Sequence, residues 1–381
     1  MRKINFWSFC LLVLLTTTCG KEKAIRIGVI LPLTPSTEGG DDRSDDGKAA
    51  HKGLELFLED LKSNIIFEVR DNRGDPAESI RLVREFADAN AAMIIGPFYS
   101  DTALAAGETA QSKGIPMLAP SATLPSVTQS GDYVFRACFL DRQQAVEMAR
   151  FAYQERGLRR MVSFSDLNYP YCLGLSEDFE SEFARLGGRV LQRYYFRSDK
   201  EAIEQIEEIA AVHPDLIYFS AYAKVVVSVL GAVGPRWRGI TVLGADGWDT
   251  PELKNVHPPL PNEVSFFITN HFDPNEENPR TIDFLNRFEE SFEEPPGQLS
   301  ALAYDACLLA EAACQAAGVR LTRDSVQRKL MELRGISGLT GTFSFDEDGN
   351  PKKSLVIQQL VIRNEDPSLE LVKRTAVPDK N

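Results

Sequence analysis

The stretch "IIGPFYSDTALAAG" (residues 94–107) joins a short apolar run to an alanine-rich segment through Gly-Pro and several hydroxyl-bearing residues. The apolar run predicts a buried strand, and the residues after Ser100 predict a helix. The first N–H groups of such a helix are unpaired and its dipole is positive there, so this corner suits an anion. Any α/β protein turns in this way, so the rest of the chain must decide what the corner does.

The alternation of strand and helix continues on both sides of this stretch. "IRIGVIL" (25–31) and "IIFEVR" (65–70) precede helical patterns near 47–61 and from Pro76. After a pause at "GDYVFRACFLDRQQ" (131–144), it resumes with "RRMVSFSD", "GRVLQRYYF", "PDLIYFS" and "GITVLGAD". Such repetition predicts parallel sheets flanked by helices, here in two consecutive α/β units.

The remaining elements follow from local signals. Asp141, followed three residues later by Gln144, predicts a capping box that opens a helix. Beyond residue 247 we expect helices near 279–292, 300–317 and 323–333. The last feature, "GTFSFDEDGNPKKSLVIQQLVI" (341–362), predicts a hairpin fixed by its Asp-Gly-Asn turn.

Residues 1–19 predict an export signal. Arg2 and Lys3 precede "INFWSFCLLVLL", which is too short to span a bilayer comfortably, and "TTTCG" resembles the lipobox of bacterial lipoproteins. Thr16 stands where that motif usually has leucine, so ordinary secretory cleavage is the alternative to lipidation of Cys19. In both cases the protein is exported, to the periplasm or the cell surface.

Composition narrows the classes of function. The 42 basic and 55 acidic residues give a net charge of −13, which argues against nucleic acid and against electrostatic attachment to anionic lipid. The motifs of nucleotide-binding loops, serine hydrolases and zinc proteases are absent, and four histidines occur at no metal-like spacing. We therefore expect no enzyme, no cofactor and no metal. The acidic loop "EGGDDRSDDGK" (38–48) is interpreted as solvated, because Gly53 stands where a calcium loop needs glutamate.

The number of cysteines and the length of the chain bear on disulfide bonds and on the number of domains. Four cysteines lie outside the leader and the lipobox, and the last two are seven residues apart on one helix face, too far to bridge each other. They are interpreted as small buried hydrophobic residues: Cys138, Cys172, Cys307 and Cys314. The mature chain of about 360 residues is long enough for two domains.

The candidate site follows from where the strands end, because ligands of doubly wound sheets bind beyond the carboxyl ends of the strands. The first unit offers hydroxyls there, and the second offers aromatic rings and one carboxylate. The candidates are Ser100, Ser121 and Thr123, then Tyr171, Tyr222, Asp246 and Trp248, with Tyr99 walling the pocket. A zwitterion fits this division, with its carboxylate on neutral donors and its ammonium on Asp246 and the ring faces. Singly, each residue has a structural explanation too: Ser100 as a helix cap, or Asp-Gly as a turn.

Seven segments in a specific order and spacing resemble one family over nearly the whole mature chain: "IRIGVILPLT", "DNRGDPAESIRLVREF", "APSATLPSVT", "YVFRACFLDRQQ", "VLGADGW", "ALAYDACLLA" and "GLTGTFSFDEDGN". Through them the chain resembles the type I periplasmic binding proteins of the leucine/isoleucine/valine-binding group. The resemblance implies a two-lobed α/β fold, each lobe a mostly parallel sheet flanked by helices. The chain would cross between lobes near 138–140, 269–272 and 341. The resemblance implies that lobe 1 consists of residues 24–139 and 273–340, that lobe 2 consists of residues 140–272 and 341–365, and that residues 366–381 form a tail.

The resemblance also implies roles for the candidate residues. Ser100, Ser121 and Thr123 would bind a ligand carboxylate, and Asp246 would meet its amino group, with Tyr171 and Tyr222 beside it. Two features depart from the family: the loop after the first strand has no aromatic residue, and Leu299 stands where an aromatic is expected. Branched-chain specificity therefore does not follow, whereas the anchor for an α-amino acid does.

The predicted function is an extracytoplasmic solute-binding lipoprotein, monomeric and anchored through Cys19. It would capture an amino acid or related small amide between its lobes and deliver it to a membrane ABC permease. One alternative is a ligand-sensing or regulatory envelope lipoprotein with the same fold. Another is an exported hydrolase using Ser100, for which no histidine lies near in sequence.

Overall fold

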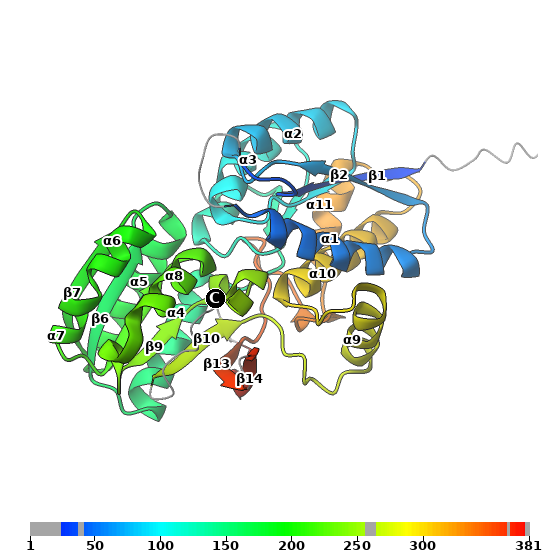
Figure 1. Ribbon diagram of the computed structural model, residues 1–381. Coiled ribbons are helices and arrows are strands. Elements are labelled where there is room, and N and C mark those ends of the chain that lie inside the picture. The colour runs from blue at the N-terminus through cyan, green and yellow to red at the C-terminus, as the bar shows by residue number, and fades with distance from the viewer. Residues whose placement is uncertain (1–23, 37–41, 256–263, 364–365, 378–381) are drawn as a thin grey trace, which may run out of the picture.

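A computed structural model describes residues 24–36, 42–255, 264–363 and 366–377. Figure 1 shows two lobes that meet near the middle of the molecule, one built around the first strands and the other around β6 to β10. Each lobe contains one large sheet with helices on its faces. The predicted two-lobed α/β architecture is therefore confirmed.

The first lobe has a five-stranded parallel sheet in the order β2-β1-β3-β4-β5. Its strands are β1 (Ile25–Leu31), β2 (Ile65–Asp71), β3 (Met93–Ile95), β4 (Met117–Ala119) and β5 (Val134–Arg136). Side chains alternate along β1: Ile27, Val29 and Leu31 join one core, and Ile30 joins the other. Both faces are thus covered, as parallel sheets require.

Helices from two distant parts of the sequence cover this sheet. On one face lie α2 (Pro76–Asp88) and α3 (Ser100–Lys113). The other face is covered by α1 (Ser44–Asp60), α9 (Pro279–Phe292), α10 (Gln298–Ala317) and α11 (Arg323–Glu332). These helices begin and end within two or three residues of the predicted bounds.

The second lobe has a seven-stranded sheet in the order β14-β13-β10-β9-β8-β6-β7. Five of its strands are parallel: β6 (Arg160–Asp166), β7 (Arg189–Phe196), β8 (Leu216–Ser220), β9 (Thr241–Gly244) and β10 (Ser265–Asn270). One face is covered by α4 (Asp141–Arg150) and α5 (Pro170–Arg185). The other is covered by α6 (Asp199–Glu204), α7 (Ile206–Ala211) and α8 (Ala223–Val233).

Two predictions about the end of the chain are wrong. The Asp-Gly-Asn segment does turn, since Asp346 N donates to Asn350 O at 2.8 Å, but it closes only one bridge, between Phe345 and Pro351. The chain then leaves the first lobe, and β13 (Val356–Arg363) pairs with β10 in the second sheet. The expected tail contains β14 (Asp366–Arg374), which pairs with β13, so the real hairpin is β13–β14.

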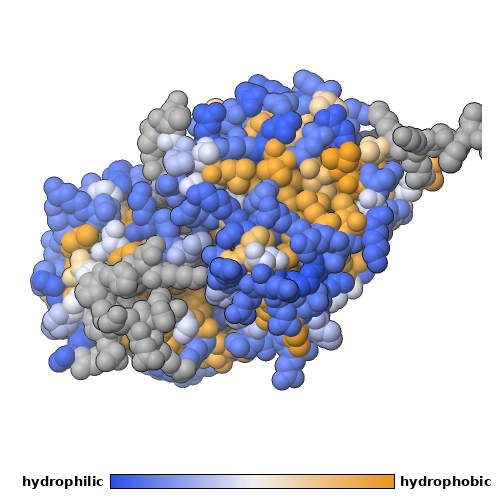
Figure 2. All heavy atoms as spheres, turned by 45° about the vertical axis from the view of Figure 1, so that its right-hand side comes forward, coloured by the Kyte–Doolittle hydropathy of each residue, from blue (hydrophilic) through white to orange (hydrophobic). Residues whose placement is uncertain are grey.

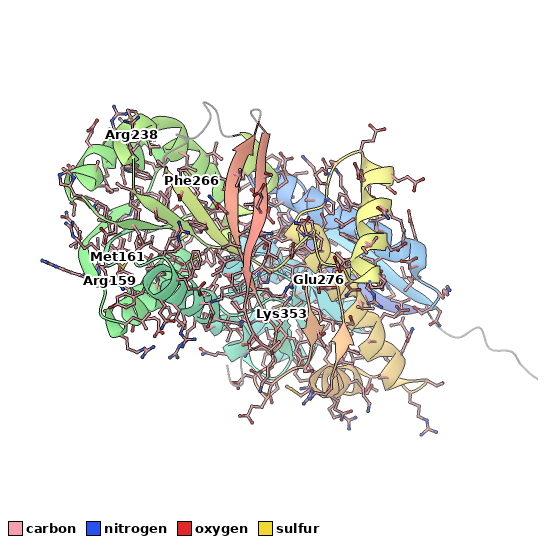
Figure 3. All side chains as sticks on the ribbon, turned by 90° about the horizontal axis from the view of Figure 1, so that it is seen from below. Arg159, Met161, Arg238, Phe266, Glu276 and Lys353 are labelled. Atoms are coloured by element: carbon pink, nitrogen blue, oxygen red, sulfur yellow. The ribbon has the colours of Figure 1, made fainter. Side chains whose placement is uncertain are left out.

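Three segments connect the lobes, and buried polar contacts tie two of them together. Lys353 is fully buried, and its Nζ donates to Thr340 Oγ1 at 2.5 Å and to Ala137 O at 3.2 Å. Thr340 in turn donates to the buried carboxylate of Asp305 on α10, through its N–H at 2.8 Å and its hydroxyl at 2.7 Å. Figure 3 shows Lys353 at this junction, below β13 and β14.

The surface, the cysteines and the search for membrane-spanning helices and metal-binding groups complete the description of the fold. Figure 2 shows a mostly hydrophilic surface with an apolar area on the first lobe. Cys138, Cys172, Cys307 and Cys314 are buried, as predicted, and all four are free thiols. Within the described ranges, no helix has the length and apolar character to cross a membrane, and acidic, histidine and cysteine side chains form no metal-like group. Cys19 and the leader lie outside the described residues.

Candidate functional site

A small cavity of about 30 Å³ lies between the lobes, beyond the carboxyl ends of strands from both sheets. It brings together seven of the eight predicted site residues. The lining consists of Asp46, Tyr99, Ser100, Ser121, Thr123, Tyr171, Tyr222, Asp246, Gly247, Thr250, Gln298 and Leu299. The space is enough for one or two water molecules, so the described form is a closed one in which the side chains contact each other.

The first lobe contributes hydroxyls at the ends of β3 and β4. Ser100 is buried at the first position of α3, and its Oγ accepts from Leu124 N at 3.3 Å. It does not cap its helix, because the N-cap is Tyr99 and no side chain bonds there. Ser121 Oγ donates to Phe98 O at 2.8 Å. The first N–H groups of α3 lie beside these hydroxyls, an arrangement of donors that is chemically suited to an anion.

Thr123 is the most suggestive of these hydroxyls. Its Oγ1 is buried and makes no hydrogen bond of full geometry, although it lies near enough to Asp141 to lower the pKa of that carboxyl. Thr250 Oγ1 and Gln298 Oε1, two more atoms of lining residues, are likewise buried without a partner. Because buried polar groups are nearly always hydrogen-bonded, these atoms are available to bond a ligand or water in the cavity.

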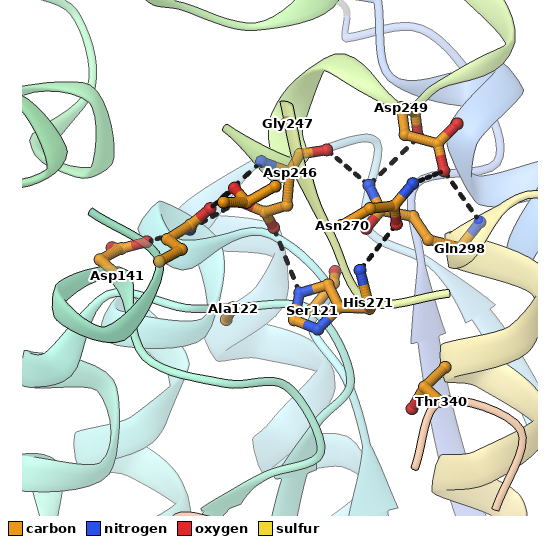
Figure 4. A network of polar contacts seen from close by, with 12 residues as sticks. Ser121, Ala122, Asp141, Asp246, Gly247, Asp249, Asn270, His271, Gln298 and Thr340 are labelled. Carbon is orange, nitrogen blue, oxygen red and sulfur yellow. Dashed lines mark hydrogen bonds and ion pairs between the residues drawn. The ribbon is translucent and has the colours of Figure 1, made fainter. Parts of the chain in front are cut away.

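The second lobe contributes a buried carboxylate. Asp246 lies just beyond β9 and is 5% exposed. Its Oδ1 accepts from Tyr171 OH and from Gln144 Nε2, both at 2.7 Å, and its Oδ2 lies 3.4 Å from His271 Nε2. Figure 4 shows the side of this network on which His271 lies next to Asp246. The contacts fix the carboxylate at the cavity wall.

The capping box predicted at Asp141 and Gln144 is wrong. The N-cap of α4 is Leu140, which has no capping side chain. Gln144 instead bonds residues at the ends of β9 and β10, where its Nε2 donates to Asp246 Oδ1 and its Oε1 accepts from Thr269 Oγ1 at 2.6 Å. Gln144 therefore serves the site, and the helix begins without a side-chain cap.

Two titratable neighbours of Asp246 are neutral at pH 7. Burial, and then the charge of Asp246, raise the pKa of Asp141 to about 8. Burial lowers the pKa of His271 to about 4, against the opposing effect of Asp246. Neither group therefore adds charge beside Asp246 at neutral pH.

Tyrosines from both lobes enclose the cavity. Tyr171 and Tyr222 stack with ring centroids 5.1 Å apart, and Tyr99 of the first lobe meets Tyr222 edge-on at 5.5 Å. Trp248 does not line the cavity: it is fully buried in the second lobe, with its ring edge-on to Phe219. Phe98 is also a core residue. The glycine at 244 allows the Trp248 ring to pack against the β9 backbone, since an added Cβ would lie 2.4 Å from it.

The acidic loop is not simply solvated, because its end enters the cleft. Arg43 is 8% exposed, donates to Asp101 at 2.9 Å, and lies over the rings of Tyr99 at 3.9 Å and Tyr222 at 5.3 Å. Asp46, in the first turn of α1, lines the cavity and accepts a hydrogen bond from Tyr99 OH. Sequence reasoning missed both residues, although their place after β1 put them at a carboxyl end of the sheet.

Comparison with known proteins identifies the family to which the chain belongs. The family described as "Periplasmic binding protein" matches residues 24–366. "Leu/Ile/Val-binding protein BraC3" of Rhizobium johnstonii is 24% identical over 60% of this chain and 63% of its own. "Leu/Ile/Val-binding protein homolog 3" of Brucella melitensis is 22% identical over 86% of this chain and 88% of its own.

Solved structures share the fold over nearly the whole chain. The leucine binding protein LivK of Thermotoga maritima superposes with a TM-score of 0.82 and 29% identity, covering 92% of this chain and 98% of its own. The substrate binding protein LivJ of Streptococcus pneumoniae, in complex with isoleucine, has a TM-score of 0.80 at 21% identity, covering 92% and 99%. The chain therefore belongs to the periplasmic binding protein family, in its type I Leu/Ile/Val-binding group, which consists of binding proteins and not of enzymes.

Proposed function

We propose that this protein captures an α-amino acid or a related small amide between its lobes and delivers it to a membrane ABC permease. The observation that carries the proposal is the inter-lobe cavity, in which hydroxyls and a helix N-terminus face a buried carboxylate. A zwitterion needs this pair of environments, one for each of its charges.

The carboxylate of the ligand would lie on the first lobe. Ser100, Ser121 and Thr123 supply hydroxyl donors there, with the first N–H groups of α3 behind them. No lysine or arginine lines the cavity among the residues that the structure describes, so the donors are neutral. The free Thr123 Oγ1 would gain its missing partner.

The ammonium would lie on the second lobe. Asp246 Oδ1 already has two donors, whereas Oδ2 has only the neutral imidazole of His271 at 3.4 Å. A charged donor at Oδ2 would form a short, charge-assisted bond. The faces of Tyr171 and Tyr222 would add cation–π attraction.

Because the anchors belong to different lobes, the ligand favours the closed form. The two lobes, each built around one of the two large sheets, would move as units about the three crossings. A permease would distinguish open from closed forms.

We further propose export by residues 1–19, a lipid anchor at Cys19 and a monomeric state. A sensing lipoprotein would use the same cavity but would not need a permease.

The test is a thermal-shift screen of the chain without its leader against amino acids, amides, urea and small peptides. A ligand that binds only the folded state raises the melting temperature by mass action. We expect at least one α-amino acid to do so, and the Asp246→Asn variant to lose that shift. A screen in which no compound shifts melting would contradict the proposal. Loss of uptake in cells lacking the protein would separate transport from sensing.

A further inference from the structure

The part of the cavity beyond the two anchors is polar. Asp46 on α1 and Gln298 on α10 both line it, together with Thr250 and Leu299. Their helices are packed against each other at this end, because Ser300 Oγ donates to Ala49 O at 2.8 Å. Asp46 and Gln298 therefore belong to neighbouring first turns of the same lobe. This wall is where the side chain of an amino-acid ligand would lie.

Gln298 presents an acceptor to this space. Its Nε2 donates to the backbone oxygens of Asp246 at 2.5 Å and Asp249 at 3.2 Å, which fixes the direction of the amide (Figure 4). The opposite atom, Oε1, is buried without a partner. An apolar ligand would leave this buried acceptor without a hydrogen bond, which is unfavourable. A ligand that carries a hydrogen-bond donor would satisfy it.

Asp46 adds a negative charge to the same wall. Asp46 and Asp246 are the two acids among the described lining residues, and no basic side chain joins them. The nearby Arg43 is already bonded to Asp101 through both carboxylate oxygens, at 2.9 and 3.1 Å. One ligand ammonium would balance Asp246 and leave Asp46 unbalanced. Burial raises the pKa of Asp46 to about 7, although the Tyr99 hydroxyl and the charge of Arg43 favour its ionised form.

The aromatic rings also favour positive charge. Tyr99 donates its hydroxyl to Asp46, and the Tyr99 and Tyr222 rings already attract the guanidinium of Arg43. Ring faces attract a ligand cation in the same way. The net charge of −13 would in addition steer cationic ligands toward the protein.

We propose that Asp46, assisted by Gln298, selects an α-amino acid with a second basic group at the end of its side chain, such as ornithine or lysine, over an aliphatic one. The inference rests on the proposed amino-acid function, because it assumes that the α-carboxylate and α-ammonium occupy the two anchors. The proposed ligand differs from the ligands in the names of the relatives reported above, which are leucine, isoleucine and valine.

The test compares ligands that differ by one group. L-lysine and L-norleucine share a carbon chain and differ in the ε-ammonium, and L-ornithine and L-norvaline form a second pair. Calorimetric titration at pH of about 7.5, above the pKa of Asp46, should give dissociation constants at least about tenfold lower for the basic member of one pair. Asp46→Asn should weaken that ligand at least about tenfold and leave its apolar partner within about twofold.

The matched control is Asp45→Asn, the same charge change one residue away. Asp45 is exposed and pairs with Lys48 at 2.7 Å outside the cavity, so both affinities should stay within about twofold. If Asp46→Asn does not fold, Asp46→Glu, which keeps the charge, should retain the preference for the basic ligand.

Several results would overturn the inference. The inference is wrong if norleucine, norvaline or leucine binds more tightly than both basic amino acids. It is also wrong if Asp46→Asn weakens the affinity for both members of a pair by the same factor. These outcomes leave the proposed function standing, since an amino acid still binds. If no amino acid of any class binds, the proposed function itself fails.

Discussion

Replacing Asp246 by asparagine removes the carboxylate that we assign to the ligand ammonium and keeps the size of the side chain. In the closed form this carboxylate is 5% exposed and accepts two hydrogen bonds of 2.7 Å. Loss of one partner of a buried charge pair costs about 2–5 kcal/mol, or roughly 30-fold to several thousand-fold in dissociation constant. The variant should therefore bind the amino acid found in the screen at least about 30-fold more weakly.

The assay is calorimetric titration of the wild type and the variant with the amino acid and with the analogue that lacks its α-amino group. The wild type should strongly prefer the amino acid, and Asp246→Asn should nearly abolish the preference, because the analogue has no ammonium to lose. Glu177→Gln, at an exposed position on α5, is the control and should behave as the wild type. If the variant keeps both the affinity and the preference, the ammonium lies elsewhere and our assignment is refuted.

Three further predictions concern the anchor, pH and the crossings. Ser100→Ala should weaken the same ligand by about 1.5–3 kcal/mol in that titration, the range for a hydrogen bond to a charged group; an unchanged affinity would place the carboxylate elsewhere. The pKa of Asp141 is about 8 in the folded state and about 3.9 in the unfolded state, so the folded state keeps a proton that the unfolded state loses, and stability should fall as pH rises from about 4 to 8. The melting temperature of Asp141→Asn should fall less over this pH range than that of the wild type. An equal fall in both proteins would contradict the prediction. Lys353→Met removes a buried cation that donates hydrogen bonds to Thr340 and Ala137, so the free energy of unfolding in urea should decrease by about 3 kcal/mol. A decrease below about 1 kcal/mol would contradict this prediction.

The fold was predictable because each element carries a local signal. In the first lobe, β1 alternates between two apolar cores, and α2 begins with Asp75 as N-cap and Pro76 in its first turn. The hairpin was mispredicted because Asp346–Asn350 does form a tight turn, but the following residues gain more by pairing with β10 in the other lobe. A local turn signal does not say which sheet the next strand will join.

The site was predictable where residues lie in the short loops beyond strand ends, as Ser100, Thr123 and Asp246 do. Asp46 and Gln298 were missed because they belong to the first turns of helices that the fold brings together from opposite ends of the chain. Trp248 was mispredicted as a lining residue because a residue four positions beyond a strand can turn back into the core, as its ring does here. These placements depend on packing between distant elements, which no local pattern reveals.

The assignment of this cavity to an α-amino acid is tested most directly by a crystal structure of the mature chain with the amino acid found in the screen. We predict a ligand between the lobes, with its ammonium about 2.7–2.9 Å from Asp246 Oδ2 and its carboxylate within hydrogen-bond distance of the Ser100 and Thr123 hydroxyls. A ligand bound in the opposite orientation, or bound outside this cavity, would contradict the account.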